Sequence, residues 1–185
     1  MKVLVIGGSQ GIGKNIIDYY DPNSFSVSRE NGYNINDSLK RNEICEISLN
    51  YDCVVNHAYS GNENQFNMLK ELISFWKEAK KGGYIFNTGT INTYYTKNDW
   101  NFYPIYKLQQ DELCKRTAKK VQENQYPFRI TNIKPGMLDT SKSREKSHWP
   151  GSGVTADNYC KVINFLYQLP EEVVIPEFII ETRVP

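Results

Sequence analysis

The first fourteen residues constrain the fold more than any other part of the chain. The apolar stretch "VLVI" (3–6) runs directly into "GGSQGIGK" (7–14), which predicts a buried strand followed by a tight turn into a helix. A helix N-terminus at such a junction presents unpaired N–H groups, so a diphosphate fits there if the backbone can approach it. We expect a tight turn at Gly7, close phosphate approach at Gly11 and close helix–strand packing at Gly13. The alternative is a glycine-rich turn that binds nothing.

Apolar runs and helical patterns alternate along the rest of the sequence. This alternation predicts a parallel sheet with helices on both faces, a doubly wound, Rossmann-like α/β fold. The length of 185 residues fits a single domain, 1–185. A polar segment at 141–153 is the candidate for a mobile insert. The expected strands are 2–7, 25–28, 52–58, 84–90, 128–136 and 177–182, and the expected helices are 13–20, 37–49, 63–81, 104–124 and 156–169.

Charge and cysteine usage exclude several classes of partner. A net charge of +1 gives no general attraction to nucleic acid or to an anionic membrane, and no apolar run approaches the ~20 residues that span a bilayer. The four cysteines form no CxxC pair and no short cluster with histidine, so we expect no metal site. Free, buried thiols favour a reducing, cytoplasmic location.

The opening motif resembles that of the short-chain dehydrogenase/reductase family, TGxxxGIG. "GIG" (11–13), which contains Ile12, matches outright, and Gly8, Ser9 and Gln10 fill the variable positions. The resemblance extends over nearly the whole chain and implies a dinucleotide-binding fold in which the residues of 7–14 hold the cofactor.

The same resemblance implies a Ser/Tyr/Lys trio with the motif Tyr-x-x-x-Lys on a helix. Tyr103 and Lys107 fit this motif, and the i,i+4 spacing places them on one helix face. A nearby ammonium lowers the pKa of a phenol, so Tyr103 could act as general acid or base, while Lys107 would also hold ribose hydroxyls. Thr90 takes the place of the family's serine, with Thr88 as the alternative. Tyr106 is a rival phenol, but the residue four positions on is an uncharged glutamine.

Three further stretches match the family's pattern. Asn56 and Ala58 fall in the segment that resembles NNAG, which lines the adenine–ribose side; His57 between them reads either as a catalytic base or as a hydrogen-bonded loop or core imidazole. Pro135, Gly136 and Thr140 resemble the Pro-Gly-x-x-x-Thr that curls under the nicotinamide, although these residues could simply end a strand. The family also uses a helical asparagine in a proton relay; Asn64 lies near the expected place, and Asn62 and Asn67 compete with it.

The end of the second strand indicates which cofactor is bound. An acidic residue there holds the ribose 2′-OH of NAD(H), whereas an arginine accommodates the 2′-phosphate of NADP(H). The chain has Ser28 and Arg29 at this position, and Lys14 and Ser9 could contact the same phosphate. We therefore predict NADP(H) over NAD(H), although Glu30 could still reach a ribose.

The chain is short for the family in two places. Only about half a dozen residues connect "FSVS" (25–28) to "YNIND" (33–37), fewer than the ~10–12 of a parallel crossover, so the family's third strand should be absent or vestigial. Asn34 and Ile35 in this segment resemble the family's Asp-Val motif beneath the adenine. The region after residue 136 leaves about a dozen residues for a minimal substrate lid.

The leading interpretation is a short-chain-type oxidoreductase acting on a carbonyl or alcohol of a small substrate. The alternatives are a non-catalytic nucleotide-binding protein, such as a redox sensor or assembly partner, and an epimerase or dehydratase, which the short C-terminal part disfavours. The family resemblance also implies a homodimer or tetramer that pairs through the two long helices, 63–81 and 104–124. Their apolar residues could instead be needed to cover the sheet; those on the first helix are Phe66, Leu69, Leu72, Phe75 and Trp76.

Overall fold

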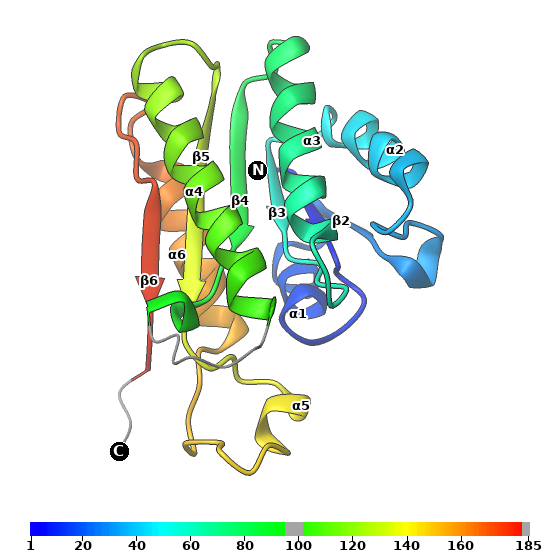
Figure 1. Cartoon of the computed structure of the whole chain (residues 1–185), viewed down its shortest axis with the longest axis vertical. Helices are drawn as coiled ribbons and strands as arrows, with labels where there is room; N and C mark the ends of the chain where they lie inside the picture. Colours follow the sequence, from blue (N-terminus) through cyan, green and yellow to red (C-terminus); the bar gives the residue numbers. More distant parts are fainter. Residues whose placement is uncertain (95–101, 183–185) are drawn as a thin grey trace.

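A six-stranded parallel sheet forms the centre of the protein (Figure 1). The computed structural model describes residues 1–94 and 102–182. The strand order is β2-β1-β3-β4-β5-β6, and every neighbouring pair is parallel. The chain thus runs outward from β1 to one edge, returns past β1 and proceeds to the other edge, which is the doubly wound arrangement predicted from the sequence. The strands are β1 (Val3–Ile6), β2 (Ser24–Val27), β3 (Cys53–Asn56), β4 (Gly83–Thr88), β5 (Phe128–Pro135) and β6 (Glu177–Ile180).

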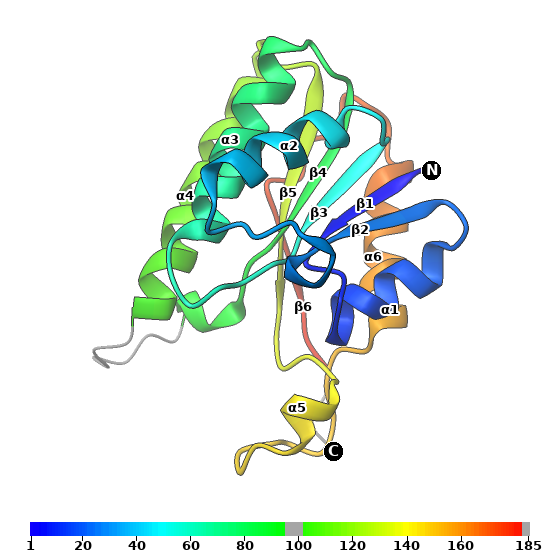
Figure 2. The same ribbon diagram turned by 90° about the vertical axis from the view of Figure 1, so that its right-hand side faces the viewer.

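Helices cover both faces of this sheet (Figure 2). One face is covered by α1 (Gly11–Tyr20) and α6 (Ala156–Gln168), and the other by α2 (Ser38–Ser48), α3 (Asn64–Glu78) and α4 (Phe102–Gln122). Strand side chains alternate between the two apolar cores: Val54 packs on the α3 side, whereas Val55 packs on the α1 side. Because all four residues of β3 are buried, its sequence does not alternate between apolar and polar residues: Cys53 to Val55 are apolar and only the last residue, Asn56, is polar.

The connection after β2 is as short as the sequence predicts. A 3-10 turn, η1 (Arg29–Asn31), leads to α2, and the chain then enters β3 beside β1. Residues 28–52 contain no strand, so the family's usual third strand is absent and β2 lies at the edge of the sheet. The loss of that strand opens the sheet edge next to the loop after β2.

The polar segment 141–153, predicted to be an insert without regular structure, contains a short helix. This helix, α5 (Ser141–Arg144), hangs beyond the carboxyl ends of the strands (Figures 1 and 2). The Thr140 hydroxyl caps it by accepting a hydrogen bond from the Ser143 N–H. An isolated β-bridge between Leu138 and Val154 joins the two ends of the segment that contains α5. A second 3-10 turn, η2 (Ile91–Tyr94), follows β4 and was not predicted.

Most of the apolar surface of α3 covers the sheet. Leu69, Leu72 and Trp76 have no exposed area, whereas Phe66 and Phe75 are partly buried. Three of these five side chains are therefore used to cover the sheet, as the alternative to a dimer contact predicts. In the described part of the chain, no helix is long and apolar enough to cross a membrane, and all four cysteines are buried free thiols.

Candidate active site

The carboxyl ends of the parallel strands form one edge of the sheet, and a cleft of about 1020 Å³ lies along it. Its walls come from the loops after β1, β2 and β3 and from the chain leading into α5. Ligands in doubly wound folds bind at this edge, where the strand order reverses. Most of the residues predicted to hold the cofactor line this cleft: Gly7, Ser9, Gln10, Gly11, Ile12, Lys14, Ser28, Arg29, Asn34, Ile35, Ala58 and Thr140.

The three motif glycines have different surroundings in the structure. A Cβ at Gly7, whose φ is +94°, would lie 2.6 Å from the Cα of Ala58, and a Cβ at Gly13 would lie 2.3 Å from the Gly7 carbonyl oxygen. Gly11 differs, because a Cβ there would meet only a methyl group of Thr140 at 3.6 Å. Gly7 and Gly13 are therefore required by packing, whereas the space beside Gly11 is free for a ligand.

The N-terminus of α1 is open toward this space. Its cap residue, Gln10, makes no capping hydrogen bond with its side chain, and the first turn contains no acidic residue. The Gln10 amide instead bridges the mouth of the cleft, donating to Glu30 (3.0 Å) and accepting from Lys142 (2.9 Å). The N-terminus of this ten-residue helix has no side-chain cap and no acidic side chain to offset its positive dipole end, so it favours an anionic group at Gly11 and Ile12.

The loop after β2 forms the far end of the cleft. Ser28 closes a capping box with Asn31, and the Asn34 side chain accepts from the Asn36 N–H at 3.1 Å. Arg29 is exposed and has no ion pair with any described residue, whereas Glu30 is engaged by Gln10. Lys14 lines the cleft, and its ammonium pairs with Asp18 on α1 at 3.3 Å. Lys142, which the sequence did not single out, also lines the cleft.

The three residues predicted to carry the chemistry come together at the other end. The hydroxyl groups of Tyr103 and Thr90 are hydrogen-bonded, and the Lys107 Nζ lies 5.7 Å from the Tyr103 ring centroid. Tyr103 also packs edge-on against Tyr59, with ring centroids 5.0 Å apart. Because Tyr59 lines the cleft, this contact places the trio next to it.

Lys107 is held by a residue that the sequence analysis missed. Its Nζ donates to Gln65 Oε1 at 2.7 Å and to the Thr88 carbonyl at 2.6 Å. The Gln65 amide is fully buried and donates in turn to the carbonyl groups of Asn56 and Thr88. The predicted relay residue, Asn64, does not reach Lys107, because its side chain donates to Asn36 on the surface. The sequence feature that could have identified this residue is the glutamine that directly follows Asn64 at the start of the helix.

The pKa shifts differ from the expectation that Lys107 lowers the pKa of Tyr103. Burial raises the pKa of Tyr103, and the hydrogen bond from Thr90 opposes this rise. Burial also lowers the pKa of Lys107 to about 7, although the nearby Asp111 carboxylate opposes that change. Since the lysine hydrogen bonds are directed to Gln65 and Thr88, the Tyr103 phenol stays protonated and is suited to donate a proton.

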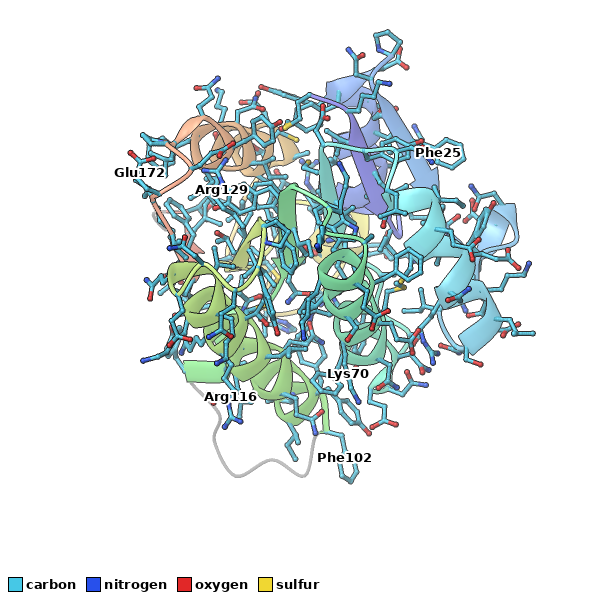
Figure 3. The ribbon with its side chains drawn as sticks, turned by 90° about the horizontal axis from the view of Figure 1, so that it is seen from above. Phe25, Lys70, Phe102, Arg116, Arg129 and Glu172 are labelled. Atoms are coloured by element: carbon cyan, nitrogen blue, oxygen red, sulfur yellow. The ribbon has the colours of Figure 1, made fainter. Side chains whose placement is uncertain are left out.

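The alternative residues have other roles. The Thr88 hydroxyl is 3.1 Å from His57 Nδ1 and 2.8 Å from the Tyr159 hydroxyl, so it does not face Tyr103 as Thr90 does. Tyr106 stacks on Phe102, with ring centroids 6.3 Å apart, and Phe102 projects from the start of α4 at the periphery (Figure 3). Thr90 and Tyr103 are thus the better-placed pair.

Five residues predicted to hold the cofactor do not line the cleft: Gly13, Asn56, Lys107, Pro135 and Gly136. Asn56 is buried and donates to Asn87 Oδ1 at 2.9 Å and to the Gln65 carbonyl, which ties β3 to β4 and α3. Pro135 ends β5, and the Gly136 N–H donates to the Ile180 carbonyl at 2.9 Å. For Pro135 and Gly136 the strand-ending alternative describes the contacts seen in this structure.

A buried ionic cluster lies under the trio. Lys134, with 1% of its side chain exposed, is 2.6 Å from Asp111 Oδ2 and 3.0 Å from Glu177 Oε2. A Cβ at Gly89 would lie 2.8 Å from the Asn132 side-chain amide and 3.0 Å from the Lys134 Cγ, so the glycine next to Thr90 makes room for both side chains. Sequence reasoning missed the cluster, because its members come from three elements far apart in the chain.

Comparisons with known proteins support the fold. No family model matches the sequence, and no curated protein matches it. Among solved structures, a short-chain type dehydrogenase/reductase from Mycobacterium ulcerans superposes with a TM-score of 0.76 and 14% identity, covering 96% of this chain and 86% of that one.

Two neighbours were solved with bound dinucleotide. A 3-ketoacyl-(acyl-carrier-protein) reductase from Brucella melitensis complexed with NADH has a TM-score of 0.74 and 15% identity, covering 97% and 96% of the two chains. L-sorbose reductase from Gluconobacter frateurii complexed with NADPH and L-sorbose has a TM-score of 0.73 and 14% identity, covering 99% and 96%. The chain has the short-chain dehydrogenase/reductase fold.

Proposed function

We propose that this protein is a short-chain-type oxidoreductase that uses NADP(H) to interconvert a carbonyl and an alcohol on a small substrate. The observation that carries the proposal is the pairing of Tyr103 with Thr90 beside Lys107, next to a cleft whose other end is an open glycine turn. Two of the fold neighbours named above were solved with NADH or NADPH.

The cleft fits a dinucleotide. Gly11 leaves room for a phosphate, and the uncapped start of α1 supplies N–H donors and a positive dipole end. When bound, the nicotinamide would supply the hydride-transfer chemistry. The loop after β2 would hold the adenosine half, with Arg29 toward a 2′-phosphate.

The chain's own residues would manage the proton. Tyr103 donates a proton to the substrate oxygen in the direction of carbonyl reduction and accepts it in reverse. The Thr90 hydroxyl holds the phenol and the substrate oxygen in line. When protonated, the buried Lys107 adds positive charge next to the phenol, and Gln65 fixes its Nζ by accepting a hydrogen bond from it. A raised pKa keeps Tyr103 protonated at neutral pH, which is the state that donates the proton in carbonyl reduction.

Replacing one hydroxyl group tests this assignment. Tyr103→Phe should reduce turnover of NADPH with a panel of small carbonyl compounds by ~100-fold or more, the usual range for a general acid, with little change in NADPH binding. Tyr106→Phe, the matched control on the same helix, should retain turnover. Retained turnover in Tyr103→Phe would remove this residue from the mechanism, and binding without turnover in the unmutated protein would favour a non-catalytic role.

A further inference from the structure

A chain of three hydrogen-bonded side chains lies behind the cleft. His57 lines the cleft after β3, and its Nδ1 is 3.1 Å from the Thr88 Oγ1 at the end of β4. The same oxygen is 2.8 Å from the hydroxyl of Tyr159 on α6, which has no exposed surface. The mechanism proposed for Tyr103 uses neither His57 nor Tyr159.

The number of hydrogens decides the direction of both bonds. The Thr88 hydroxyl has one hydrogen, so it donates either to His57 or to Tyr159, and not to both. If it donated to Tyr159, the phenol hydrogen would have no acceptor among the described residues. If His57 and Tyr159 both donated to Thr88, the threonine hydrogen would be unpaired. A buried donor without a partner carries its full desolvation penalty, so Tyr159 donates to Thr88 and Thr88 donates to His57 Nδ1.

This order fixes the state of the imidazole ring. With Nδ1 as an acceptor, the neutral ring carries its hydrogen on Nε2. Burial and the positive charge of Lys107 lower the pKa of His57 to about 4, so the ring stays neutral at physiological pH. No described residue accepts from Nε2, and His57 is only partly covered at the cleft.

The position of His57 indicates which part of a ligand it meets. The next residue, Ala58, packs against Gly7 of the glycine turn. On its other side, the hydrogen-bond partner Thr88 binds Lys107 through its carbonyl. A dinucleotide that extends from the glycine turn to Tyr103 therefore passes His57 with the part between its diphosphate and its second ribose.

We propose that His57 is a further binding residue, whose Nε2–H donates to an oxygen of the diphosphate or of the adjoining ribose. Thr88 and Tyr159 are positioning residues that hold the ring in this tautomer. The assignment rests on the proposed dinucleotide site and adds to it a neutral, directional donor between the glycine turn and the reacting pair.

Nitrogen NMR of the ligand-free protein tests the tautomer without any ligand. The chain has two histidines, so a His148→Gln variant leaves the His57 signals alone in the spectrum. We expect an unprotonated Nδ1 and a protonated Nε2 near neutral pH. A protonated Nδ1 would overturn the assignment.

Equilibrium titration tests the donor. His57→Leu should weaken NADPH binding about tenfold, which corresponds to about 1.4 kcal/mol, whereas His148→Leu should bind as the unmutated protein does. Titration with ADP separates the two acceptors, because a loss seen with ADP indicates the diphosphate and a loss seen only with NADPH indicates the ribose beyond it. Unchanged NADPH affinity in a folded His57→Leu protein would refute the proposal.

The failure of this proposal and that of the proposed function are distinguishable. If the unmutated protein bound neither NADPH nor NADH, the dinucleotide site itself would be wrong, and the binding role of His57 would fall with it. The predicted tautomer would still be testable by NMR. If the unmutated protein bound NADPH and His57→Leu bound it equally well, only the role of His57 would be lost.

Discussion

Gly13→Ala should destabilise the protein even though alanine is the better helix former. The new Cβ would lie 2.3 Å from the Gly7 carbonyl oxygen and 3.1 Å from the Cα of Gly8. Both neighbours are backbone atoms at the end of β1, so relief requires α1 to move away from the sheet. Overpacking of this kind lowers the free energy of unfolding by about 3 kcal/mol. The higher helix propensity of alanine offsets about 1 kcal/mol of this loss.

The net loss of about 2 kcal/mol corresponds to a fall in Tm of about 4–8 °C for a chain of this size. Thermal unfolding followed by circular dichroism measures this fall. The matched control is Gly82→Ala, because a Cβ at this exposed glycine would come no closer than 3.6 Å to the Pro127 carbonyl oxygen, and its Tm should stay within about 2 °C. Equal Tm values for the two variants would refute the close contact between α1 and β1 on which the shape of the glycine turn depends.

Three other perturbations address the cleft and the buried charges. Arg29→Ala should weaken NADPH binding about tenfold or more and leave NADH binding nearly unchanged, since only NADPH carries the 2′-phosphate; equal losses for both cofactors would contradict this role. Lys134→Met should lower the free energy of unfolding by about 3–5 kcal/mol in urea, because it leaves the buried Asp111 carboxylate without its ion pair and leaves Glu177 paired only with Lys115 at 3.6 Å. The half-exposed Lys115→Met should cost less than about 1 kcal/mol. The pKa of His57 is lowered to about 4, so between that value and about 6.5 only the unfolded state binds the extra proton, and stability falls as the pH drops through this window. Between about pH 7 and pH 4.5 the unmutated protein should therefore lose more stability than His57→Gln, by up to roughly 3 kcal/mol. Equal losses in the two proteins would show that the ring is not held neutral.

The architecture could be predicted because local patterns determine it. The apolar run at Val3–Ile6 and the glycines after it define the first strand, the turn and α1. The short link after β2 cannot hold a parallel crossover, and the structure confirms that no strand intervenes there. The polar composition of 141–153 gave no signal for α5, because a helix of four residues depends on one cap and its tertiary surroundings rather than on periodicity.

The site was predicted in part, for a similar reason. Tyr103 and Lys107 lie one helical turn apart, so their spacing reveals them. Gln65, Thr88 and Tyr159 reach the site through contacts between distant elements: Lys107 and Gln65 are 42 positions apart in the sequence, and Thr88 and Tyr159 are 71 positions apart. The family resemblance favoured Asn64 as the helical polar residue of the site. In the structure the buried neighbour, Gln65, contacts Lys107 instead, and burial cannot be read from one sequence.

The central claim is that one cleft places a dinucleotide between the glycine turn and Tyr103. The most direct measurement is a crystal structure of the protein grown with NADPH. The account predicts the diphosphate against the N–H groups of Gly11 and Ile12, with the nicotinamide ring beside the Tyr103 hydroxyl. A cleft without the dinucleotide, or a ring turned away from that hydroxyl, would contradict it.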